Sequence, residues 1–285
     1  MLFKKGERTT GELCCEIIRP VSKGPMAELY LAVLIGTEHK LMVKAAGQNE
    51  IWQNNLKQEA ALLTGLRHVG IPEIFDFVKD VERSYYIMSY HEGITLAQYM
   101  QRYSKISQQT VHNMAKALCK ILDYLHDREV PIIHGDIKPA NILLQNDELV
   151  LLDFGAARAM TNKLQDVYFQ GTLGYAAPEC WHQKSGDIKC AERNAKELFC
   201  VRTKQDSRQQ ICPATDIFAL GATMYYLLEG REPQHCFGQY ELSDCPESKK
   251  NRWQPVLKRC TALDIRDRYQ SAAELYHDLT KMNVK

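Results

Sequence analysis

The stretch His134-Gly-Asp-Ile-Lys-Pro-Ala-Asn141, followed further along the chain by Asp153-Phe-Gly155, carries the strongest signal in the sequence. Phosphoryl transfer needs a held phosphate, neutralised charge and a placed acceptor hydroxyl. A loop carboxylate such as Asp136 can orient that hydroxyl and accept its proton. Lys138 can reach the transferring phosphate, and Asn141 offers an oxygen ligand of the kind that Mg²⁺ prefers. The stretch therefore predicts phosphotransfer chemistry.

Two features upstream fit the same chemistry. Lys44 stands on an otherwise apolar strand segment, 41–45, and an ammonium group in that setting needs an anionic partner. Glu59 on the helix that follows is the natural partner, and nucleotide phosphates are the other. Between the first two strands, the turn in residues 21–30 contains Gly24, and small residues in such a turn let backbone N–H groups approach phosphates.

Downstream segments predict structural support. Residues 171–179 read Gly-Thr-Leu-Gly-Tyr-Ala-Ala-Pro-Glu, and residues 216–221 read Asp-Ile-Phe-Ala-Leu-Gly. Acidic side chains buried in a helical region need cationic or backbone partners. Arg268 is therefore predicted to pair in a bidentate way with Glu179.

Hydrophobic periodicity divides the chain into a β-rich part and an α-rich part. Short alternating segments and turn residues predict strands in the first part, and apolar positions at three- and four-residue spacing predict helices. The predicted strands are 12–19, 27–35, 40–45, 74–78, 84–89, 142–144 and 150–152. The predicted helices are 51–66, 96–103, 108–127, 215–229 and 272–281. The stretch 181–210 is polar and charge-rich, which predicts a surface insertion, partly helical or disordered.

In this order, the turn, the strand lysine, the helix glutamate, H-x-D-x-K-x-x-N, D-F-G, A-P-E, D-x-x-x-x-G and the late arginine resemble the eukaryotic-type (Hanks-type) Ser/Thr protein kinase family, including its bacterial members. The resemblance covers residues 17–279. It implies an α+β, bilobal fold, with a β-rich N-terminal lobe over 1–88, a mainly α-helical C-terminal lobe over 89–285 and the insertion near 181–210.

The resemblance also implies roles for the matching positions. Asp136 would be the catalytic base, Lys138 would stabilise the γ-phosphate, Thr172 would help place the substrate, and Lys44, fixed by Glu59, would contact the α- and β-phosphates. Magnesium, or manganese as an alternative, would bind Asn141 and Asp153. The remaining predicted ATP contacts are Val21, Ser22, Gly24, Ala27, Leu29, Met88, Ser89, Tyr90, His91 and Leu143. Among these, Val21, Leu29 and Leu143 would enclose the adenine ring, and Met88 would guard the back of its pocket.

Several positions depart from the family pattern. Ser22 and Ala27 stand where the outer glycines of the turn are usual, which predicts a stiffer turn and weaker ATP binding. Met42 replaces a usual alanine beside the adenine and would narrow the pocket. Gly135 replaces the arginine that commonly pairs with a phosphorylated activation segment. Activity is therefore expected not to depend strictly on phosphorylation at Thr161, Tyr168 or Thr172.

Bulk composition narrows the setting. A formal net charge of +1 gives no overall bias toward nucleic acid or an anionic membrane. The first residues lack the apolar core of a signal peptide, and no run is long and apolar enough to span a membrane, so a cytoplasmic protein with reduced thiols is expected. Cys180, Cys190, Cys200 and Cys212 lack the close pairs typical of zinc sites.

Two other functions stay open. The His-Gly-Asp loop also occurs in small-molecule phosphotransferases, and the altered glycine-rich turn favours a non-catalytic pseudokinase that serves as a nucleotide-binding scaffold. Lys138 and the 171–179 segment favour a protein kinase acting on protein substrates. The sequence does not identify the substrate, the oligomeric state or the role of the insertion, for which a docking partner is the preferred interpretation.

Overall fold

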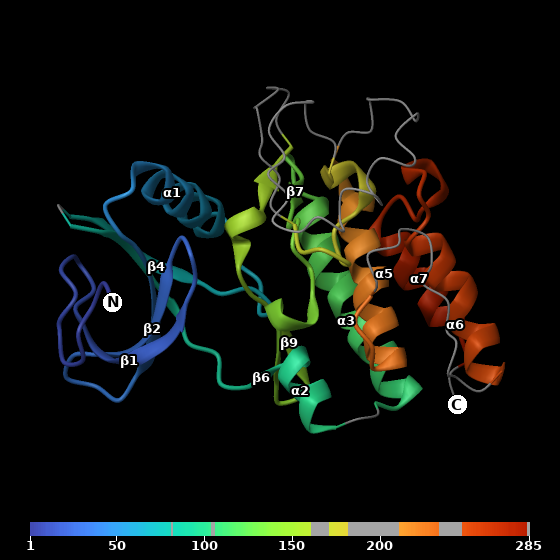
Figure 1. Ribbon diagram of the computed structural model, residues 1–285, viewed down its shortest axis with the longest axis horizontal. Helices are drawn as coiled ribbons and strands as arrows, with labels where there is room; N and C mark the ends of the chain where they lie inside the picture. The colour runs from blue at the N-terminus through green and yellow to red at the C-terminus, as the bar shows by residue number, and fades with distance from the viewer. Residues whose placement is uncertain (81, 104–105, 161–170, 182–210, 234–246, 284–285) are drawn as a thin grey trace, which may run out of the picture. The chain divides into compact units, whose positions relative to one another are not determined.

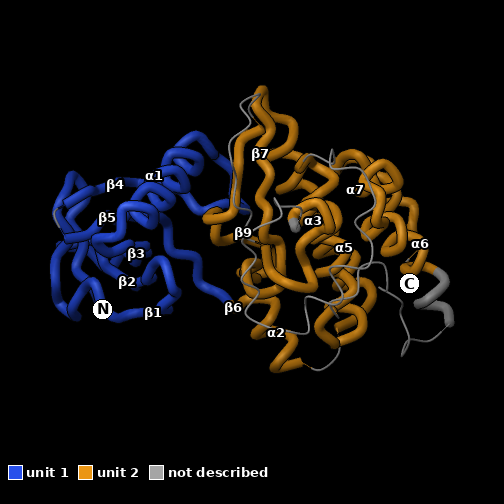
Figure 2. The backbone as a smooth tube through the Cα atoms, turned by 45° about the horizontal axis from the view of Figure 1, so that its top comes forward, with its two compact units in different colours: residues 1–93 blue, residues 94–285 orange. Residues whose placement is uncertain are grey.

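A computed structural model describes residues 1–80, 82–103, 106–160, 171–181, 211–233 and 247–283. The chain forms two compact units, Met1–Gly93 and Ile94–Lys285 (Figures 1 and 2). The first is dominated by strands and the second by helices, so the predicted α+β class is confirmed. The assignment of lobes with a boundary after residue 88 stays a prediction.

The N-terminal unit contains one antiparallel sheet in the order β1-β2-β3-β5-β4. Side chains alternate between its two faces, and this period of two is what the sequence displayed. The strands are β1 (Cys15–Lys23), β2 (Glu28–Leu34), β3 (Lys40–Ala46), β4 (Ile74–Lys79) and β5 (Ser84–Ser89). The bounds predicted for β5 are confirmed at both ends.

Helix α1 (Glu50–Thr64) contacts β3, β4 and β5. Asn49 caps its first turn by accepting a hydrogen bond from the Trp52 amide, at 3.1 Å. The helix stops before Gly65 and so ends earlier than predicted, although Leu66 beyond it is buried as expected. This helix carries Glu59 on its buried face.

A hydrophobic cluster covers one face of the sheet and includes the start of the chain. It consists of buried residues of β1, β2, β3 and β5 together with Phe3: Phe3, Cys15, Ile17, Tyr30, Ala32, Leu41, Val43, Ala45, Tyr85 and Ile87. Residues 6–9 run beside β1, with hydrogen bonds between the Gly6 amide and the Ile17 carbonyl at 2.8 Å and between the Thr9 amide and the Cys15 carbonyl at 2.8 Å. The sequence did not predict this addition to the sheet.

The C-terminal unit is built on helices that contact one another as α3 with α5, α3 with α7 and α5 with α6. Its helices are α2 (Leu96–Arg102), α3 (Gln108–His126), α5 (Pro213–Glu229), α6 (Glu247–Cys260) and α7 (Ala272–Lys281). The apolar positions of α3 that recur at three- and four-residue spacing are all buried: Met114, Leu118, Ile121, Leu122 and Leu125. Helix α6 was not predicted.

Close contact between α5 and α6 depends on a glycine. A Cβ atom added to Gly221 would lie 2.5 Å from the Cβ of Cys260 and 2.9 Å from the Cγ2 of Thr261. Real Cβ atoms do not approach so closely, so any side chain at position 221 would push the helices apart. The glycine of the D-x-x-x-x-G motif thus serves packing.

Short strands of this unit hold the loops that carry its polar residues. Strands β6 (Ile94–Thr95), β8 (Ile142–Gln145) and β9 (Glu148–Leu151) form one small sheet, and β7 (Ile132–Ile133) pairs with β10 (Arg158–Ala159). Single-turn 3-10 helices follow at Pro139–Asn141, Phe154–Ala156, Pro178–Trp181 and Ile265–Asp267. The 134–141 loop therefore leaves β7 and enters β8.

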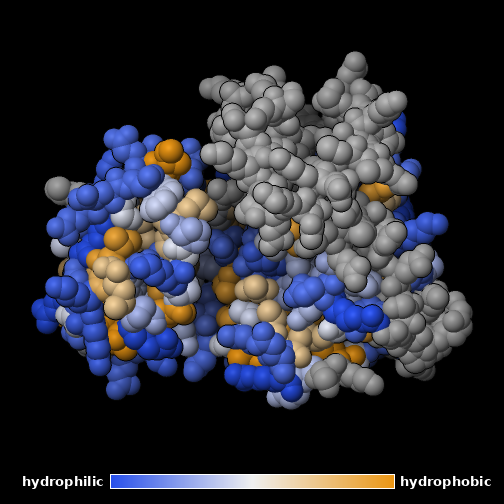
Figure 3. Space-filling view, viewed as in Figure 1, coloured by the Kyte–Doolittle hydropathy of each residue, from blue (hydrophilic) through white to orange (hydrophobic). Residues whose placement is uncertain are grey.

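The surface of the described residues is ordinary in character. Figure 3 shows hydrophobic side chains exposed among hydrophilic ones on the face it presents. Ile51 and Val69 are among the exposed large hydrophobic residues, and single exposed apolar side chains are common in soluble domains. Among the described residues, no helix is long and apolar enough to cross a bilayer.

Two carboxylates of the N-terminal unit, Glu7 and Glu28, should make the free energy of unfolding depend on pH in the acid range. Burial raises the pKa of Glu28, but hydrogen bonds from Tyr30 and the Leu2 amide lower it by more, so it lies below its ordinary 4.5. The same holds for Glu7. Burial raises the pKa of its carboxyl, but hydrogen bonds from the Lys4 amide and from Arg83 lower it by more, so the pKa lies below its ordinary 4.5. Carboxylates with depressed pKa values contribute stability above the unfolded pKa and lose it as the pH falls through the folded value.

We therefore expect the difference in free energy of unfolding between wild type and Glu28→Gln to be constant above pH about 5 and to shrink below about 4.5. Urea titrations at a series of pH values measure this difference. A difference that stays the same down to pH about 3 would contradict the assignment.

Candidate active site

The backbone at the start of the 134–141 loop is hydrogen-bonded to a side chain of α5. Asp216 is fully buried, and its carboxylate accepts hydrogen bonds from the amides of His134, at 2.8 Å, and Gly135, at 2.9 Å. The Nε2 atom of His126 on α3 lies 2.9 Å from the same carboxylate. The prediction that Asp216 has backbone or cationic partners is confirmed. His126 was missed, because its partner lies on a distant helix.

Side chains of this loop and of the 171–179 segment converge on Asp136. Lys138 Nζ lies 2.7 Å from Asp136 Oδ2, and the Thr172 hydroxyl donates to Asp136 Oδ1 at 2.6 Å. Lys138 Nζ also donates to Thr172 Oγ1, at 2.5 Å. One carboxylate, one ammonium and one hydroxyl thus form a closed triangle. Each group fixes the position of the other two.

Asn141 completes this cluster from the far end of the loop. Its Nδ2 atom donates to Asp136 Oδ2 and to the Asp136 carbonyl oxygen, at 2.9 Å each. The amide nitrogen is therefore committed, and the oxygen Oδ1 is the atom that Asn141 has to offer a cation. The geometry thus matches a ligand that presents oxygen.

Asp153 lies one residue beyond a direct backbone link to Asn141. The Leu152 amide donates to the Asn141 carbonyl at 2.7 Å. Asp153 is exposed and has φ 59°, a left-handed conformation that aspartate tolerates better than most residues. Phe154 behind it is buried, with its ring 4.7 Å from that of His134 in an edge-on contact. The buried phenylalanine anchors the turn that exposes the carboxylate.

These two residues fit a divalent metal of the magnesium kind. Mg²⁺ is usually held by one or two protein oxygens together with substrate phosphates, and not by a complete protein cage. Among the described residues, no group of three or more His, Cys, Asp or Glu side chains could hold a metal ion. Cys190 and Cys200 lie outside the described residues.

The N-terminal unit contains the predicted lysine–glutamate pair. Lys44 Nζ on β3 donates to both carboxylate oxygens of Glu59 on α1, at 2.7 and 2.8 Å. The side chain of Glu59 is only 4% exposed and that of Lys44 17%. The predicted partnership is confirmed, and it places one partly accessible cation on the sheet.

The predicted phosphate-binding turn connects β1 and β2. Lys23 and Glu28 form the last strand pair before it, and the Gly24 amide donates to the Ala27 carbonyl at 2.9 Å. Ser22 lies in β1 opposite Leu29, and Val21 is exposed on the same strand. The predicted turn is therefore the tight connection of a β-hairpin formed by β1 and β2.

The predicted adenine-binding segment follows β5. The Ser89 amide donates to the Glu73 carbonyl at 2.9 Å, so this amide is already engaged. Ser89 Oγ contacts His91 Nε2 at 2.8 Å. The roles of Ser89, Tyr90 and His91 in binding adenine stay predictions. Met88 and Leu143 lie in β5 and β8, in different units, and their shared role with Val21 and Leu29 stays a prediction.

Comparison with known families decides how this arrangement should be classified. The family described as "Protein kinase domain" matches residues 15–281, almost the whole chain. The chain belongs to the protein kinase domain family. Members of this family use ATP with a divalent metal ion and act on protein substrates, which agrees with the chemistry of the residues around Asp136.

Individual relatives extend the comparison. The kinase chain is 33% identical over 174 residues to Aurora kinase C of Mus musculus, covering 59% of this chain and 62% of the relative. It is 26% identical over 296 residues to serine/threonine-protein kinase PrkC of Bacillus subtilis, covering 96% of this chain and 41% of the relative. It is 27% identical to serine/threonine-protein kinase PknD of Chlamydia caviae, covering 93% of this chain and 30% of the relative. The chain thus spans less than two thirds of each.

The backbone conformation at Gly135 explains what a substitution there would do. Gly135 has φ 79°, in the left-handed region that disfavours side chains. Gly135→Ala should therefore lower the free energy of unfolding by about 1–2 kcal/mol. Denaturant titration measures this, with Gly65→Ala as the control, since Gly65 has φ −82°, a right-handed conformation that alanine adopts without strain. Equal stability of wild type and Gly135→Ala would contradict the prediction.

The predicted insertion near 181–210 and the hydroxyls of Thr161 and Tyr168 lie outside the described residues. The proposed docking of a partner at the insertion stays a prediction. Just ahead of this interval, Glu179 pairs with Arg268, whose Nη1 and Nη2 atoms donate to the two carboxylate oxygens at 2.7 and 2.8 Å. The predicted bidentate geometry is confirmed.

Proposed function

We propose that this chain is a Ser/Thr protein kinase that transfers the γ-phosphate of ATP to hydroxyl groups of protein substrates. The observation that carries the proposal is the triangle of Asp136, Lys138 and Thr172. A scaffold that only binds nucleotide has no use for a carboxylate held between a cation and a hydroxyl. An enzyme that must orient a substrate hydroxyl has such a use.

Each member of the triangle has a role in this proposal. Asp136 accepts the proton of the substrate hydroxyl and aims its oxygen at the phosphate. Lys138, 2.7 Å from that carboxylate, is near enough to neutralise charge on the transferring group. Thr172 bonds to both the carboxylate and the ammonium, and it would help place the substrate next to Asp136. In the resting geometry the Thr172 hydroxyl occupies a site on Asp136 that a substrate hydroxyl would take or share.

Two further groups would handle the nucleotide. Asn141 and Asp153 would hold Mg²⁺, with Mn²⁺ as the alternative, and this ion would neutralise charge on the phosphates. Lys44, fixed by Glu59, would contact the α- and β-phosphates. The bidentate bond to Glu59 supports this role, because it limits the lysine to one direction.

An acceptor comparison tests the proposal. Wild-type protein is incubated with radiolabelled ATP and Mg²⁺, with generic basic proteins in one arm and a panel of small alcohols and amino sugars in the other. Label on phosphoserine or phosphothreonine supports the proposal. Label on small alcohols alone would favour a small-molecule phosphotransferase. Thermal stabilisation by ATP and Mg²⁺ without transfer to any acceptor would favour a nucleotide-binding scaffold.

Phosphorylation of the 153–179 segment should not be required for activity. Gly135 supplies no guanidinium that could pair with a phosphate there. Phosphatase-treated enzyme is therefore expected to keep at least about half of its turnover. Steady-state assays before and after treatment measure this, with mass spectrometry to verify removal. Near-total loss of turnover, restored by Thr161→Glu, would show that the segment must be phosphorylated.

A further inference from the structure

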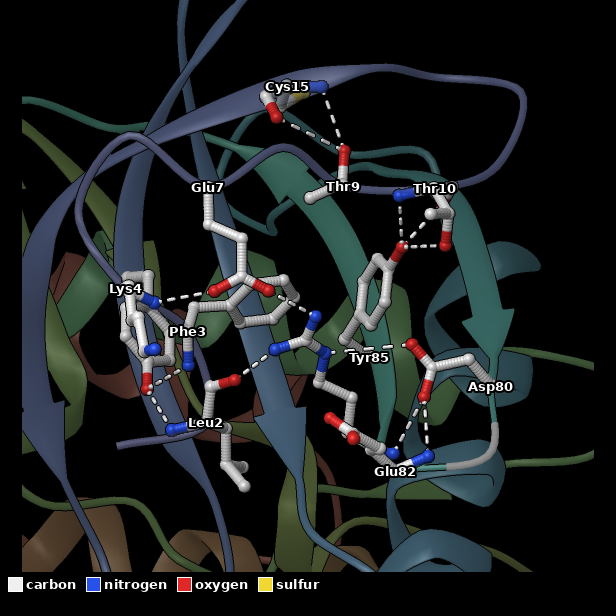
Figure 4. A network of polar contacts seen from close by, with 12 residues as sticks. Leu2, Phe3, Lys4, Glu7, Thr9, Thr10, Cys15, Asp80, Glu82 and Tyr85 are labelled. Atoms are coloured by element: carbon white, nitrogen blue, oxygen red, sulfur yellow. Dashed lines mark hydrogen bonds and ion pairs between the residues drawn. The ribbon is translucent and has the colours of Figure 1, made fainter.

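The first ten residues lie ahead of the part of the chain that the family shares, yet they are built into the N-terminal unit. Phe3 is 1% exposed. Its ring makes edge-on contacts with Tyr30 and Tyr85, at 5.4 and 5.2 Å between centroids, and the Arg83 guanidinium lies 3.7 Å from its centroid (Figure 4). Arg83 also donates to the Leu2 carbonyl. The segment is therefore fixed both by the contacts of the Phe3 ring and by the hydrogen bond to its backbone at Leu2.

Three hydrogen bonds from the backbone amides of this segment lead to β2. The Leu2 amide donates to Glu28 Oε2 at 2.7 Å and to the Tyr30 hydroxyl at 2.8 Å, and the Phe3 amide donates to the same hydroxyl at 3.1 Å. Tyr30 in turn donates its hydroxyl proton to Glu28. The phenol thus joins the backbone of the segment to one buried carboxylate.

Glu28 is the first residue of β2 after the predicted phosphate-binding turn. Only residues 24–27 separate it from its strand partner Lys23, whose Nζ lies 3.5 Å from Glu28 Oε1. Oε2 of Glu28 therefore contacts the N-terminal segment, and Oε1 lies between the N-terminal amine of Met1, at 3.6 Å, and Lys23, the last residue before the turn. If the N-terminal segment moved, the side chain of Glu28 would move with it and would disturb Lys23, the residue that precedes the turn.

We propose that the N-terminal segment 2–10 positions the phosphate-binding turn, with Tyr30 and Glu28 as the positioning residues. This inference rests on the proposed function, because it assigns ATP phosphates to the turn. The turn has a single glycine, Gly24, where relatives of this pattern have three, and its amides must already stand in place for binding. Holding a binding segment in its bound conformation lowers the ordering cost of association.

Removal of one hydroxyl tests the inference with little change in shape. Tyr30→Phe removes the phenol oxygen that joins the segment to Glu28. Tyr85→Phe is the matched control: this phenol is equally buried and also bonds to the segment, but through Thr10, whose amide lies 2.7 Å away. Both variants should lose similar thermal stability. Only Tyr30→Phe should alter the turn.

Two readouts are measured below the unfolding temperature. Hydrogen exchange at residues 22–27 in nucleotide-free protein should be faster in Tyr30→Phe than in Tyr85→Phe. The KM for ATP should rise about 3–10-fold in Tyr30→Phe with kcat within about twofold of wild type. Phe3→Ala, compared with Leu41→Ala in the same hydrophobic cluster, repeats the test if Tyr30→Phe folds poorly.

The outcomes separate the two proposals. Turn exchange in Tyr30→Phe that equals the control, or a KM that stays unchanged in an active enzyme, overturns the positioning role. Wild-type protein that neither binds nucleotide nor transfers phosphate overturns the proposed function instead. In that case the exchange comparison still decides whether the segment holds the turn.

Discussion

Replacing Asp136 by asparagine is expected to lower kcat by about 10²–10⁴-fold, because the amide cannot accept the proton of the substrate hydroxyl. The substitution keeps the size of the side chain and one oxygen for Thr172, so the loop should keep its shape. The neighbours Lys138 and Asn141 both donate to the present carboxylate, and the amide group can satisfy only part of this demand. The loss should therefore fall on turnover and not on nucleotide binding.

Single-turnover and steady-state assays measure the effect, and thermal shift with ATP and Mg²⁺ measures binding. Asp127→Asn is the matched control, since it makes the same chemical change at an exposed position at the end of α3. The control should keep wild-type kcat. If Asp136→Asn kept more than about a tenth of wild-type kcat, the role of Asp136 as base would be wrong.

Removal of Arg268 is expected to have the largest effect on stability. Its side chain and that of Glu179 are both 0% exposed, and two hydrogen bonds join them. Arg268→Ala would leave Glu179 as a buried charge that keeps one neutral donor, Thr215. Breaking such a pair typically costs about 3–5 kcal/mol, whereas replacing both partners by apolar residues costs far less.

Equilibrium denaturation of three variants separates these effects. Arg268→Ala should lower the free energy of unfolding to about 3 kcal/mol or more below wild type, which is most of the cost of breaking the pair. The double variant Glu179→Leu with Arg268→Met should be much closer to wild type in its free energy of unfolding. Arg266→Ala is the control, because its side chain is 83% exposed and its ion pair with Asp264 should contribute less than about 1 kcal/mol. An Arg268→Ala variant as stable as Arg266→Ala would contradict the prediction.

The cluster around Asp136 could be predicted because its members are close in the sequence or belong to ordered motifs. Asp136, Lys138 and Asn141 share one loop, and their proximity follows from chain connectivity. Thr172 joins them across a long separation, and only the order of motifs indicated it. The Lys44–Glu59 pair was predictable for a different reason: a cation on an apolar strand has few partners to choose from.

Elements without a local signal were missed. Helix α6 contains Pro255, which argues against a helix interior. Among its described side chains the buried apolar ones are Trp253, Val256, Leu257 and Cys260, too few to outweigh its charged residues. The N-terminal segment has one large apolar residue at its core, Phe3. Its burial depends on partners that β2 and β5 bring together, and neither composition nor periodicity reports such a meeting.

The bond between Thr215 Oγ1 and Glu179 Oε1, at 2.8 Å, has a consequence for how this family can diversify. It fastens the two borders of the 180–214 interval to each other, and Arg268 secures the same carboxylate from a third direction. Lengthening a chain segment whose ends are already joined costs only about 0.6 kcal/mol per doubling of its length. Evolution, or a protein engineer, can therefore exchange this interval for a sensor or a recruitment module while the residues around Asp136 keep their alignment.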